Sequence, residues 1–372
     1  MDLGALSRLL KGLVSLSPGH IVMIALGASL INLAIVRRYE PLLLLPIGFG
    51  CILANIPATG MTAAGGLLHT FYEAGITTEV LPALIFVGVG ALTDFGPLLE
   101  NPILILLGAA AQFGIFGTLL MATVMGFGIR EAASIGVIGS ADGPTSIYVA
   151  AVLAPSLLGP IAVAAYSYMS LVPVIQPPVM RLLTTREERR IQMPYSVRAI
   201  SHTTRIIFPI VVTIVCGLLL PMATPLIGML MFGNLMRESG VVNRLSQAAE
   251  NEMANIVTIL LGVAVGSTMT AENFLHGRTV LIVVMGLVAF ALDTAAGVLF
   301  GKLMCVLSGR RINPLIGASG ISAFPMSARV VQRVGQEEDF SNYLLMHAMA
   351  SNTAGQIASV MAGGAILALL TG

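Results

Sequence analysis

The sequence predicts an all-α polytopic membrane protein with about ten transmembrane helices and two re-entrant hairpins, arranged as inverted repeats in the manner of a transporter. Two observations support this fold class. First, 56% of the 372 residues are hydrophobic and 10% are charged, whereas a soluble domain carries roughly 25% charged residues. Second, two apolar segments in opposite halves of the chain are interrupted by glycine and proline in the same pattern. Much of the surface must therefore face lipid.

Apolar runs of about 20 residues, the length that crosses a bilayer, mark the predicted spans. They lie at 20–36, 41–57, 79–96, 102–127, 157–178, 205–221, 224–236, 252–269, 279–308 and 343–365. Two further apolar stretches, 131–155 and 313–330, are broken near their middles. A broken helix frees backbone groups that lipid cannot satisfy, so each stretch is predicted to fold back as a hairpin inside the protein.

Arginines predict the orientation, because the cytoplasmic loops of membrane proteins are enriched in Lys and Arg. Arg37 and Arg38 place the end of the first span inside, and no small-residue cleavage site follows it, so we expect a retained span and not a signal peptide. Segment 181–205 carries six arginines, at 181, 186, 189, 190, 198 and 205. It is predicted to be a cytoplasmic linker in a multi-pass plasma-membrane protein. Hairpin 131–155 then enters from outside and hairpin 313–330 from the cytoplasm.

An internal repeat relates the two halves of the chain. Residues 135–147 align without gaps to residues 316–328, and Pro144 matches Pro325. Because the two halves have opposite predicted orientations, the repeat is an inverted one. The chain is therefore predicted to divide into a first inverted repeat at 1–180, the basic linker at 181–205 and a second inverted repeat at 206–372.

Asp142 is the leading candidate for a functional residue. In proteins with inverted repeats the transport site lies near the midplane, where the broken helices meet. The hairpin tips are predicted to meet there and to bring Ser140 and Asp142 near Asn313 and Ser322. A carboxylate inside a membrane is costly and marks an ion path by default, and its small polar neighbours suit sodium or a proton. The alternative is that Asp142 only forms an Asp-Gly-Pro turn at the surface.

Other ionisable residues carry weaker signals. Asp293 interrupts an apolar run, and the sequence leaves open whether it is a second relay or pairs with a polar neighbour. Arg329 ends the second hairpin, where its spacing alone favours a cytoplasmic-side anchor over a binding role. Tyr168 lies in the middle of a span and is expected to donate one hydrogen bond. Asp94 and Glu100 flank a short loop and are expected to be solvated.

Composition argues against several functional classes. The net charge of +1 gives no indication of a nucleic-acid partner. The three cysteines, Cys51, Cys216 and Cys305, lie in apolar runs and are expected to be inert packing residues. No spacing of cysteine and histidine is typical of a zinc or copper site.

Several long motifs resemble the β subunits of biotin-dependent, sodium-translocating decarboxylases. They are IGSADGPTSI at 138–147, NPLIGASGISAFPMSAR at 313–329, YEPLLLLPIGFG at 39–50, TDFGPLL at 93–99 and GNLMRESG at 233–240. The resemblance runs from about residue 20 to residue 365. This family includes the oxaloacetate, methylmalonyl-CoA and glutaconyl-CoA decarboxylases.

The resemblance implies a reaction and a set of partners. A carboxytransferase (α) subunit would move carboxylate onto biotin of a carrier protein or domain. The β subunit would decarboxylate this carboxybiotin, export Na+ and consume one periplasmic proton, together with a small membrane subunit of the γ/δ type and as a homotrimer. The implied sodium ligands are Asp142, Asn313, Gly317, Ser322 and Asn352; the implied catalytic residues are Asp142, Tyr168, Ser322 and Arg329, of which Arg329 contacts the carboxylate on biotin.

Three functional hypotheses follow from the sequence. The leading hypothesis is a membrane-bound carboxybiotin decarboxylase that pumps sodium by alternating access, and the complete motif at 313–329 with its arginine favours it. The second is a stand-alone sodium-coupled secondary transporter of an organic anion, which shares inverted repeats and paired hairpins. The third is a structural membrane anchor for a soluble enzyme, which the polar residues at both hairpins disfavour.

Overall fold

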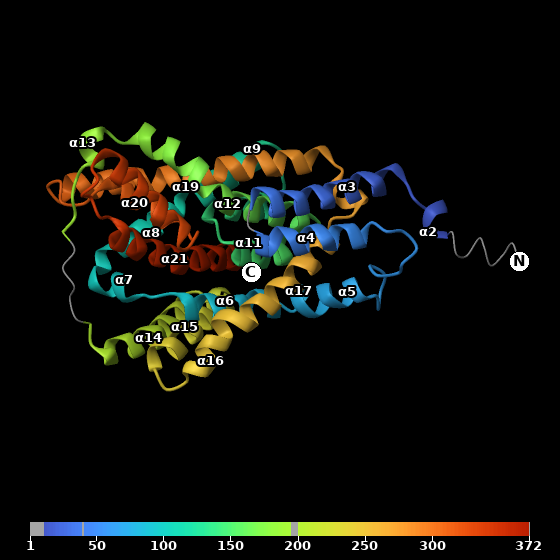
Figure 1. Ribbon diagram of the computed structural model, residues 1–372, viewed down its shortest axis with the longest axis horizontal. Coiled ribbons are helices and arrows are strands. Elements are labelled where there is room, and N and C mark those ends of the chain that lie inside the picture. The colour runs from blue at the N-terminus through green and yellow to red at the C-terminus, as the bar shows by residue number, and fades with distance from the viewer. Residues whose placement is uncertain (1–10, 39–40, 195–199, 372) are drawn as a thin grey trace, which may run out of the picture.

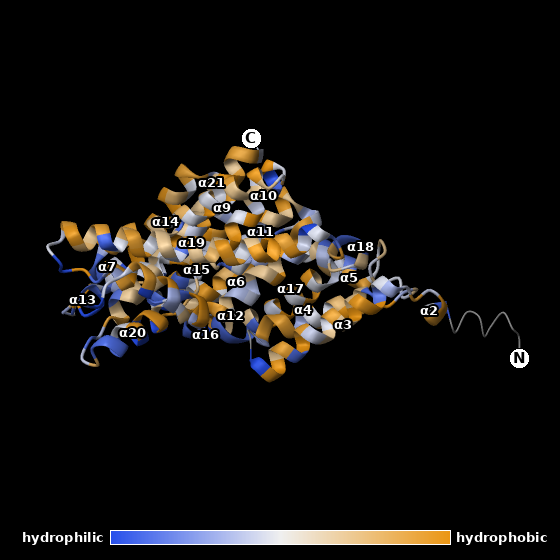
Figure 2. Cartoon of the chain, turned by 90° about the horizontal axis from the view of Figure 1, so that it is seen from above, coloured by the Kyte–Doolittle hydropathy of each residue, from blue (hydrophilic) through white to orange (hydrophobic). Residues whose placement is uncertain are grey.

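The computed structural model describes residues 11–38, 41–194 and 200–371. Every regular element within these ranges is a helix, and none is a strand. The longer helices lie side by side along the long axis of the molecule (Figure 1). Apolar residues dominate the middle of the molecule, and hydrophilic residues gather at one end around α13 (Arg186–Arg189) and α20 (Met326–Glu338) (Figure 2). This distribution is the one expected of a protein whose midsection faces lipid.

Six helices of the described chain are long and apolar enough to cross a membrane, and two bent helix pairs raise this number to at most eight. The six are Pro18–Arg37, Pro102–Val124, His202–Leu219, Asn243–Ser267, Gly277–Leu307 and Leu345–Thr371; the bent pairs are Leu67–Thr77 with Val80–Leu92 and Pro155–Met169 with Leu171–Leu183. The predicted spans 41–57 and 224–236 form α4 (Pro41–Ala54) and α15 (Thr224–Ser239), which are shorter than about 20 residues. The structure therefore supports six to eight spans, and ten stays a prediction.

The other α-helices of the described residues, outside the two broken segments, are α2 (Lys11–Val14), α3 (Pro18–Asn32), α5 (Leu67–Tyr72), α6 (Val80–Leu92), α7 (Gly96–Glu100), α8 (Ile105–Ala111), α9 (Phe113–Val124), α12 (Leu158–Leu183), α14 (His202–Leu219), α16 (Asn243–Ala248), α17 (Ala254–Ser267), α18 (Ala271–Phe274), α19 (Gly277–Leu307) and α21 (Leu345–Thr371). In Figure 1, α14, α15 and α16 form the lower edge of the molecule, and α3 and α19 lie along its upper edge.

Both segments predicted to be broken are interrupted. The first consists of α10 (Ile129–Gly136), the 3₁₀ turn η4 (Val137–Ser140) and α11 (Gly143–Leu153). The second consists of the 3₁₀ helix η8 (Pro314–Gly320), a short non-helical stretch at 321–325 and α20. A proline stands at each interruption: Pro144 lies in the first turn of α11, where its missing N–H leaves no helical hydrogen bond unmade, and Pro325 directly precedes α20.

The long helix α19 packs against both broken segments. Its 31 residues span about 46 Å. Near one end, Arg278 lies 3.4 Å from Glu131 at the base of the first segment. Near the other end, Lys302 lies 3.4 Å from Glu188 of the linker, which is docked on the second segment. The two segments therefore start from opposite ends of α19.

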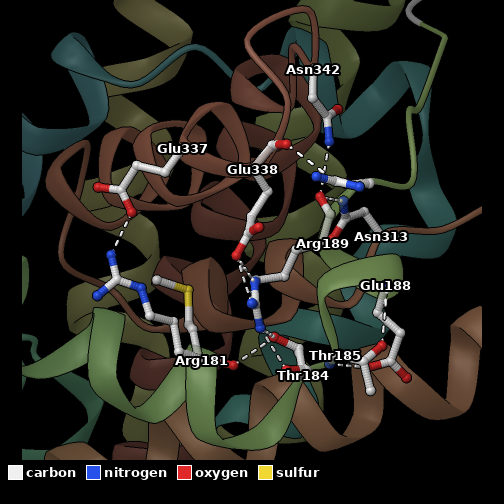
Figure 3. Close-up of polar contacts among 11 residues, drawn as sticks. Arg181, Thr184, Thr185, Glu188, Arg189, Asn313, Glu337, Glu338 and Asn342 are labelled. Carbon is white, nitrogen blue, oxygen red and sulfur yellow. Dashed lines mark hydrogen bonds and ion pairs between the residues drawn. The ribbon is translucent and has the colours of Figure 1, made fainter.

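The start of the basic linker is folded onto the base of the second broken segment (Figure 3). The Arg189 side chain is only 8% exposed, and its Nη2 lies 2.6 Å from Oε1 of Glu338. Hydrogen bonds from Arg189 lower the pKa of the Glu338 carboxyl. The amides of Asn313 and Asn342 both donate to the carbonyl oxygens of Arg189 and Ile191. Of the six linker arginines, Arg198 lies outside the described residues.

Candidate functional site

The tip of the first broken segment presents Asp142 at the start of a helix. Ala141 has a left-handed backbone with φ 54°, which turns the chain out of η4, and Asp142 then caps α11. The backbone N–H of Thr145 donates to Oδ1 of Asp142 over 3.2 Å. Aspartate is a favoured N-cap because its carboxylate accepts from amides that the helix leaves free. The side chain is only 5% exposed, so the surface-turn alternative is wrong.

The second tip meets the first at this carboxylate. The N–H of Ser322 donates to the carbonyl oxygen of Ser140 over 2.8 Å, and the Ser322 hydroxyl lies 3.3 Å from Oδ2 of Asp142. The predicted meeting of Ser140, Asp142 and Ser322 is therefore confirmed. A second hydroxyl, that of Ser359 on α21, donates to the same Oδ2 over 2.6 Å and lies 3.2 Å from the Ser322 hydroxyl.

Ser359 was missed in the sequence. It lies 217 residues from Asp142 along the chain, in a helix with no acidic or basic residue in its first or last turn. The sequence contains a weak signal, because Asn352, Gln356 and Ser359 follow one another at helical spacing. This spacing places their side chains on one face of α21, and that face is turned towards the two tips.

A cavity of about 100 Å³ adjoins the carboxylate. Its polar lining residues are Asp142, Ser322 and Gln356, and the rest of the lining comes mainly from apolar side chains of α6 and the two tips. A space of this size accommodates a small cation with a few water molecules. The grouping of a carboxylate with hydroxyl oxygens is typical of sites for hard cations.

Asn352 holds the second tip from the side of α21. Its side-chain nitrogen donates to the carbonyl oxygens of Ser319 and Ile321 over 3.1 and 2.6 Å. Its Oδ1 is fully buried and is one of the described side-chain oxygens without a hydrogen-bond partner. A buried carbonyl oxygen without a partner costs free energy unless a donor or a cation satisfies it. Asn352 can therefore offer one oxygen ligand beside the tip.

Asn313 and Gly317 lie away from the carboxylate. The side-chain nitrogen of Asn313 donates to the linker carbonyl oxygens of Arg189 and Ile191. Its Oδ1 accepts from the N–H of Leu315. The seven residues of η8, which rise about 14 Å in a 3₁₀ helix, separate it from the tip. Gly317 packs on α19, where an added Cβ would approach the carbonyl oxygen of Gly297 to 2.0 Å. The expected closeness of Asn313 to Asp142 is thus not seen, because the linker binds its amide.

Tyr168 is buried next to the site rather than in it. Its hydroxyl donates to the carbonyl oxygen of Val283 on α19, which is the single satisfied bond expected from the sequence. Its ring lies against Gly286 of α19, where an added Cβ would approach the ring to 2.7 Å. The next residue, Met169, lines the cavity beside Asp142.

Arg329 is exposed on α20, at the linker end of the molecule. It lines an open groove of about 200 Å³ together with Pro173, Met326, Val330 and Arg333. Arg333 is engaged, since it donates to the carbonyl oxygen of Pro173 over 3.2 Å. No ion pair in the described part of the chain includes Arg329, so its five N–H donors are available to an anion in this groove.

Comparison with known proteins finds relatives along nearly the whole chain. A family model described as the Na+-transporting oxaloacetate decarboxylase beta subunit matches residues 19–370. Glutaconyl-CoA decarboxylase subunit beta of Acidaminococcus fermentans is 56% identical, over 97% of this chain and 96% of that protein. Methylmalonyl-CoA decarboxylase subunit beta of Veillonella parvula is 55% identical over 97% of this chain and 96% of that protein. The probable oxaloacetate decarboxylase beta chain of Vibrio cholerae is 49% identical over 97% and 98%.

Proposed function

We infer the function of this chain from its family: it belongs to the Na+-transporting oxaloacetate decarboxylase beta subunits. We propose that it is the membrane subunit of a sodium pump, which decarboxylates carboxybiotin and couples the reaction to Na+ export with consumption of a proton. The observation that carries the proposal is the buried Asp142 carboxylate, on which two broken segments from opposite ends of the molecule converge. The relatives act on different acids, so the acid is not assigned.

Asp142 is the proposed sodium ligand at the centre of the site. Its carboxylate supplies the negative charge, and the hydroxyl oxygens of Ser322 and Ser359 already lie within hydrogen-bond distance of it. The free Oδ1 of Asn352 is the remaining side-chain ligand that we propose. Gly317 and Asn313 were also implied as ligands by the family resemblance. We propose that they act indirectly, by seating η8 on α19 and on the linker.

Arg329 is the proposed contact to carboxybiotin. A guanidinium presents a planar pair of donors that fits a carboxylate bidentately, and the groove beside it is open to a tethered ligand. Loss of CO₂ leaves negative charge on the ureido nitrogen of biotin, and a proton must neutralise it. One proton taken up per carboxylate lost balances this step. Proton entry against sodium exit would also compensate the charge that is moved.

The transport architecture that we propose has ten spans and two re-entrant segments in inverted repeats at 1–180 and 206–372. The interrupted segments, their start from opposite ends of α19 and their meeting at Asp142 support this arrangement. Interrupted helices at corresponding positions of two repeats are a feature of transporters with midplane sites. The two tips with their neighbouring helices would move as a block against the remaining spans.

The proposed assembly lies in the plasma membrane with the linker 181–205 in the cytoplasm. The proposed partners are a carboxytransferase (α) subunit, a biotin carrier protein or domain, a small γ/δ-type membrane subunit and two further copies of this chain. Lipid or protein must cover the apolar helices Pro18–Arg37 and His202–Leu219. Within the chain itself, only 22% of the apolar 18-residue window of the first helix is buried, and only 6% of that of the second. The exposed Arg329 groove lies at the linker end, where a soluble carrier would dock.

Substitution of Ser359 by alanine is expected to raise the Na+ concentration for half-maximal stimulation of decarboxylation about tenfold, with little effect on the maximal rate. The variant removes a hydrogen bond to a charged group, which is worth roughly 1.5–3 kcal/mol. The measurement is decarboxylation against Na+ concentration. Ser267→Ala is the matched control, since its buried hydroxyl bonds only to the carbonyl oxygen of Ala264 in its own helix. An unchanged Na+ dependence in Ser359→Ala would remove Ser359 from the site.

Affinity purification of the tagged chain tests the pump directly. We expect a biotin-bearing protein, detected with labelled avidin, to copurify with it, and we expect the complex to decarboxylate in a sodium-stimulated manner. The competing function, a stand-alone sodium–organic anion symporter, predicts a different result. If no biotinylated partner copurifies and liposomes containing the chain take up sodium only when an organic anion is added, the symporter is correct.

A further inference from the structure

A second buried carboxylate, Asp293, lies in the middle of α19 and has no part in the site described above. Its side chain is fully buried. Neither of its oxygens makes a hydrogen bond of ordinary geometry within the described chain. An ionised carboxylate without partners is one of the most costly groups that a membrane protein can contain. The position therefore requires a physical explanation.

The carboxyl group of Asp293 is enclosed by two glycines from different elements. A Cβ added to Gly114, at the start of α9, would lie 2.1 Å from Oδ1. A Cβ added to Gly139, in η4, would lie 2.2 Å from Oδ2. Any larger residue at either position would displace the carboxyl group. This close packing leaves room for a proton on Asp293 but not for a sodium ion, which needs several oxygen ligands around it.

No cationic side chain of the described residues forms an ion pair with Asp293. Four of the elements that pack on α19, namely α8, α9, η4 and η8, contain no titratable residue. In α10, Glu131 is paired with Arg278 near the far end of α19, and Arg130 donates to the carbonyl oxygen of Leu370. In α19 itself, Lys302 is engaged with Glu188, and nine residues, or about 13 Å, separate it from Asp293.

The titratable residues of α12 are also engaged elsewhere. The Tyr168 hydroxyl is bonded to the carbonyl oxygen of Val283, and the Tyr166 ring lies against Gly143. Arg181 is paired with Glu337 at the linker end. The charge state of Asp293 is therefore governed by backbone groups and by burial.

The backbone groups nearest to the carboxylate are the first amides of α9. The N–H groups of Gly114 and Ile115 face it, although neither closes a hydrogen bond of good geometry. The N–H of Ile115 donates to the carbonyl oxygen of Gln112 instead. The N-terminus of a helix stabilises a negative charge, but this effect falls off within the first turn. A small displacement of α9 from Asp293 would therefore leave the charged carboxylate unsupported.

We propose that Asp293 binds and releases a proton as the broken segments move, and so forms a proton site separate from the sodium site at Asp142. The carboxylate takes up one proton to become a carboxylic acid, and returns it in the reverse step. The coupling is geometric: Gly139, which covers Asp293, directly precedes Ser140, whose carbonyl oxygen binds the N–H of Ser322 at the second tip. The inference rests on the proposed pump function, in which a proton is consumed.

The test uses the complete complex in proteoliposomes and the variant Asp293→Asn. The amide has the shape of the carboxylate and can still accept from the amides of α9, but it cannot exchange a proton. We expect turnover to fall by at least about a hundredfold, the size of a lost proton-transfer group, with less than about a twofold change in the Na+ concentration for half-maximal stimulation. Turnover and internal proton uptake at the parent rate would show that Asp293 only caps α9, and would overturn the inference.

A measurement on the parent complex covers the case in which Asp293→Asn does not assemble. Infrared difference spectra between high and low pH should contain the carbonyl band of a protonated carboxyl in apolar surroundings, and the band should persist in Asp142→Asn. Absence of this band from the parent complex would overturn the inference. If Asp293→Asn works normally while Asp142→Asn is inactive, the pump function stands and the proton site fails. If the band is present but no sodium-dependent decarboxylation occurs, the proton site stands and the pump function fails.

Discussion

Substitution of Asp142 by asparagine is expected to abolish sodium-stimulated decarboxylation, with a loss of at least about a hundredfold in rate. The proposed sodium ion relies on one negative charge, and a neutral amide cannot replace it in surroundings where the ion has left its water. The amide also turns an N–H₂ donor towards the hydroxyls of Ser322 and Ser359. The measurement is the rate of decarboxylation by the purified complex over a range of Na+ concentrations.

The fold of this variant should survive, which makes the result interpretable. Asparagine caps a helix about as well as aspartate, so the contact to the N–H of Thr145 is retained. Asp94→Asn is the matched control, because that carboxylate is 41% exposed and lies 3.7 Å from Arg205 at the surface. The control should keep the parent rate. Sodium stimulation that persists in Asp142→Asn would rule out Asp142 as the ion-binding carboxylate.

Substitution of Arg329 by glutamine is expected to lower the rate of carboxybiotin decarboxylation by about a hundredfold or more, while sodium binding to the isolated complex stays intact. The guanidinium is the one group of the groove that is both cationic and without an ion pair in the described chain, so its loss leaves the incoming carboxylate without a charged partner. Lysine should restore part of the activity, because it supplies the charge without the bidentate geometry. The measurement is decarboxylation of the carboxylated carrier protein, with KM and kcat determined separately.

A matched substitution of Arg310, at the same end of the molecule, distinguishes two roles for Arg329: an anchor on the cytoplasmic side and a contact to carboxybiotin. Arg310 is 72% exposed and lies 3.9 Å from Glu187. If Arg329 is only a cytoplasmic-side anchor, as its spacing in the sequence favours, Arg329→Gln and Arg310→Gln should have equally small effects on decarboxylation. A large loss confined to Arg329→Gln is the result expected from the carboxybiotin contact.

The sequence predicts a residue of the candidate site only where the neighbouring residues in the chain mark it. Asp142 and Ser322 are found from the sequence because each lies in an interrupted apolar segment, and the two segments share a pattern. Ser359 gave little signal, because a serine in an apolar helix is unremarkable until a carboxylate from a distant segment lies beside it. Asn313 was expected at the same place, but Arg189 and Ile191 of the linker bind its amide. Nothing in the order of residues around Asn313 shows that contact.

The class of the protein and the location of its unusual segments were determined by the sequence alone. Low charge and long apolar runs require a membrane-spanning helical protein, and glycine and proline at matching positions interrupt two of its segments. The number of spans did not follow, because two apolar runs form helices of only 14 and 16 residues. Only the tertiary structure decided what surrounds each buried carboxylate. Three hydroxyl and amide donors from different elements meet Asp142, whereas two glycines enclose Asp293, since packing and not local order brings distant segments together.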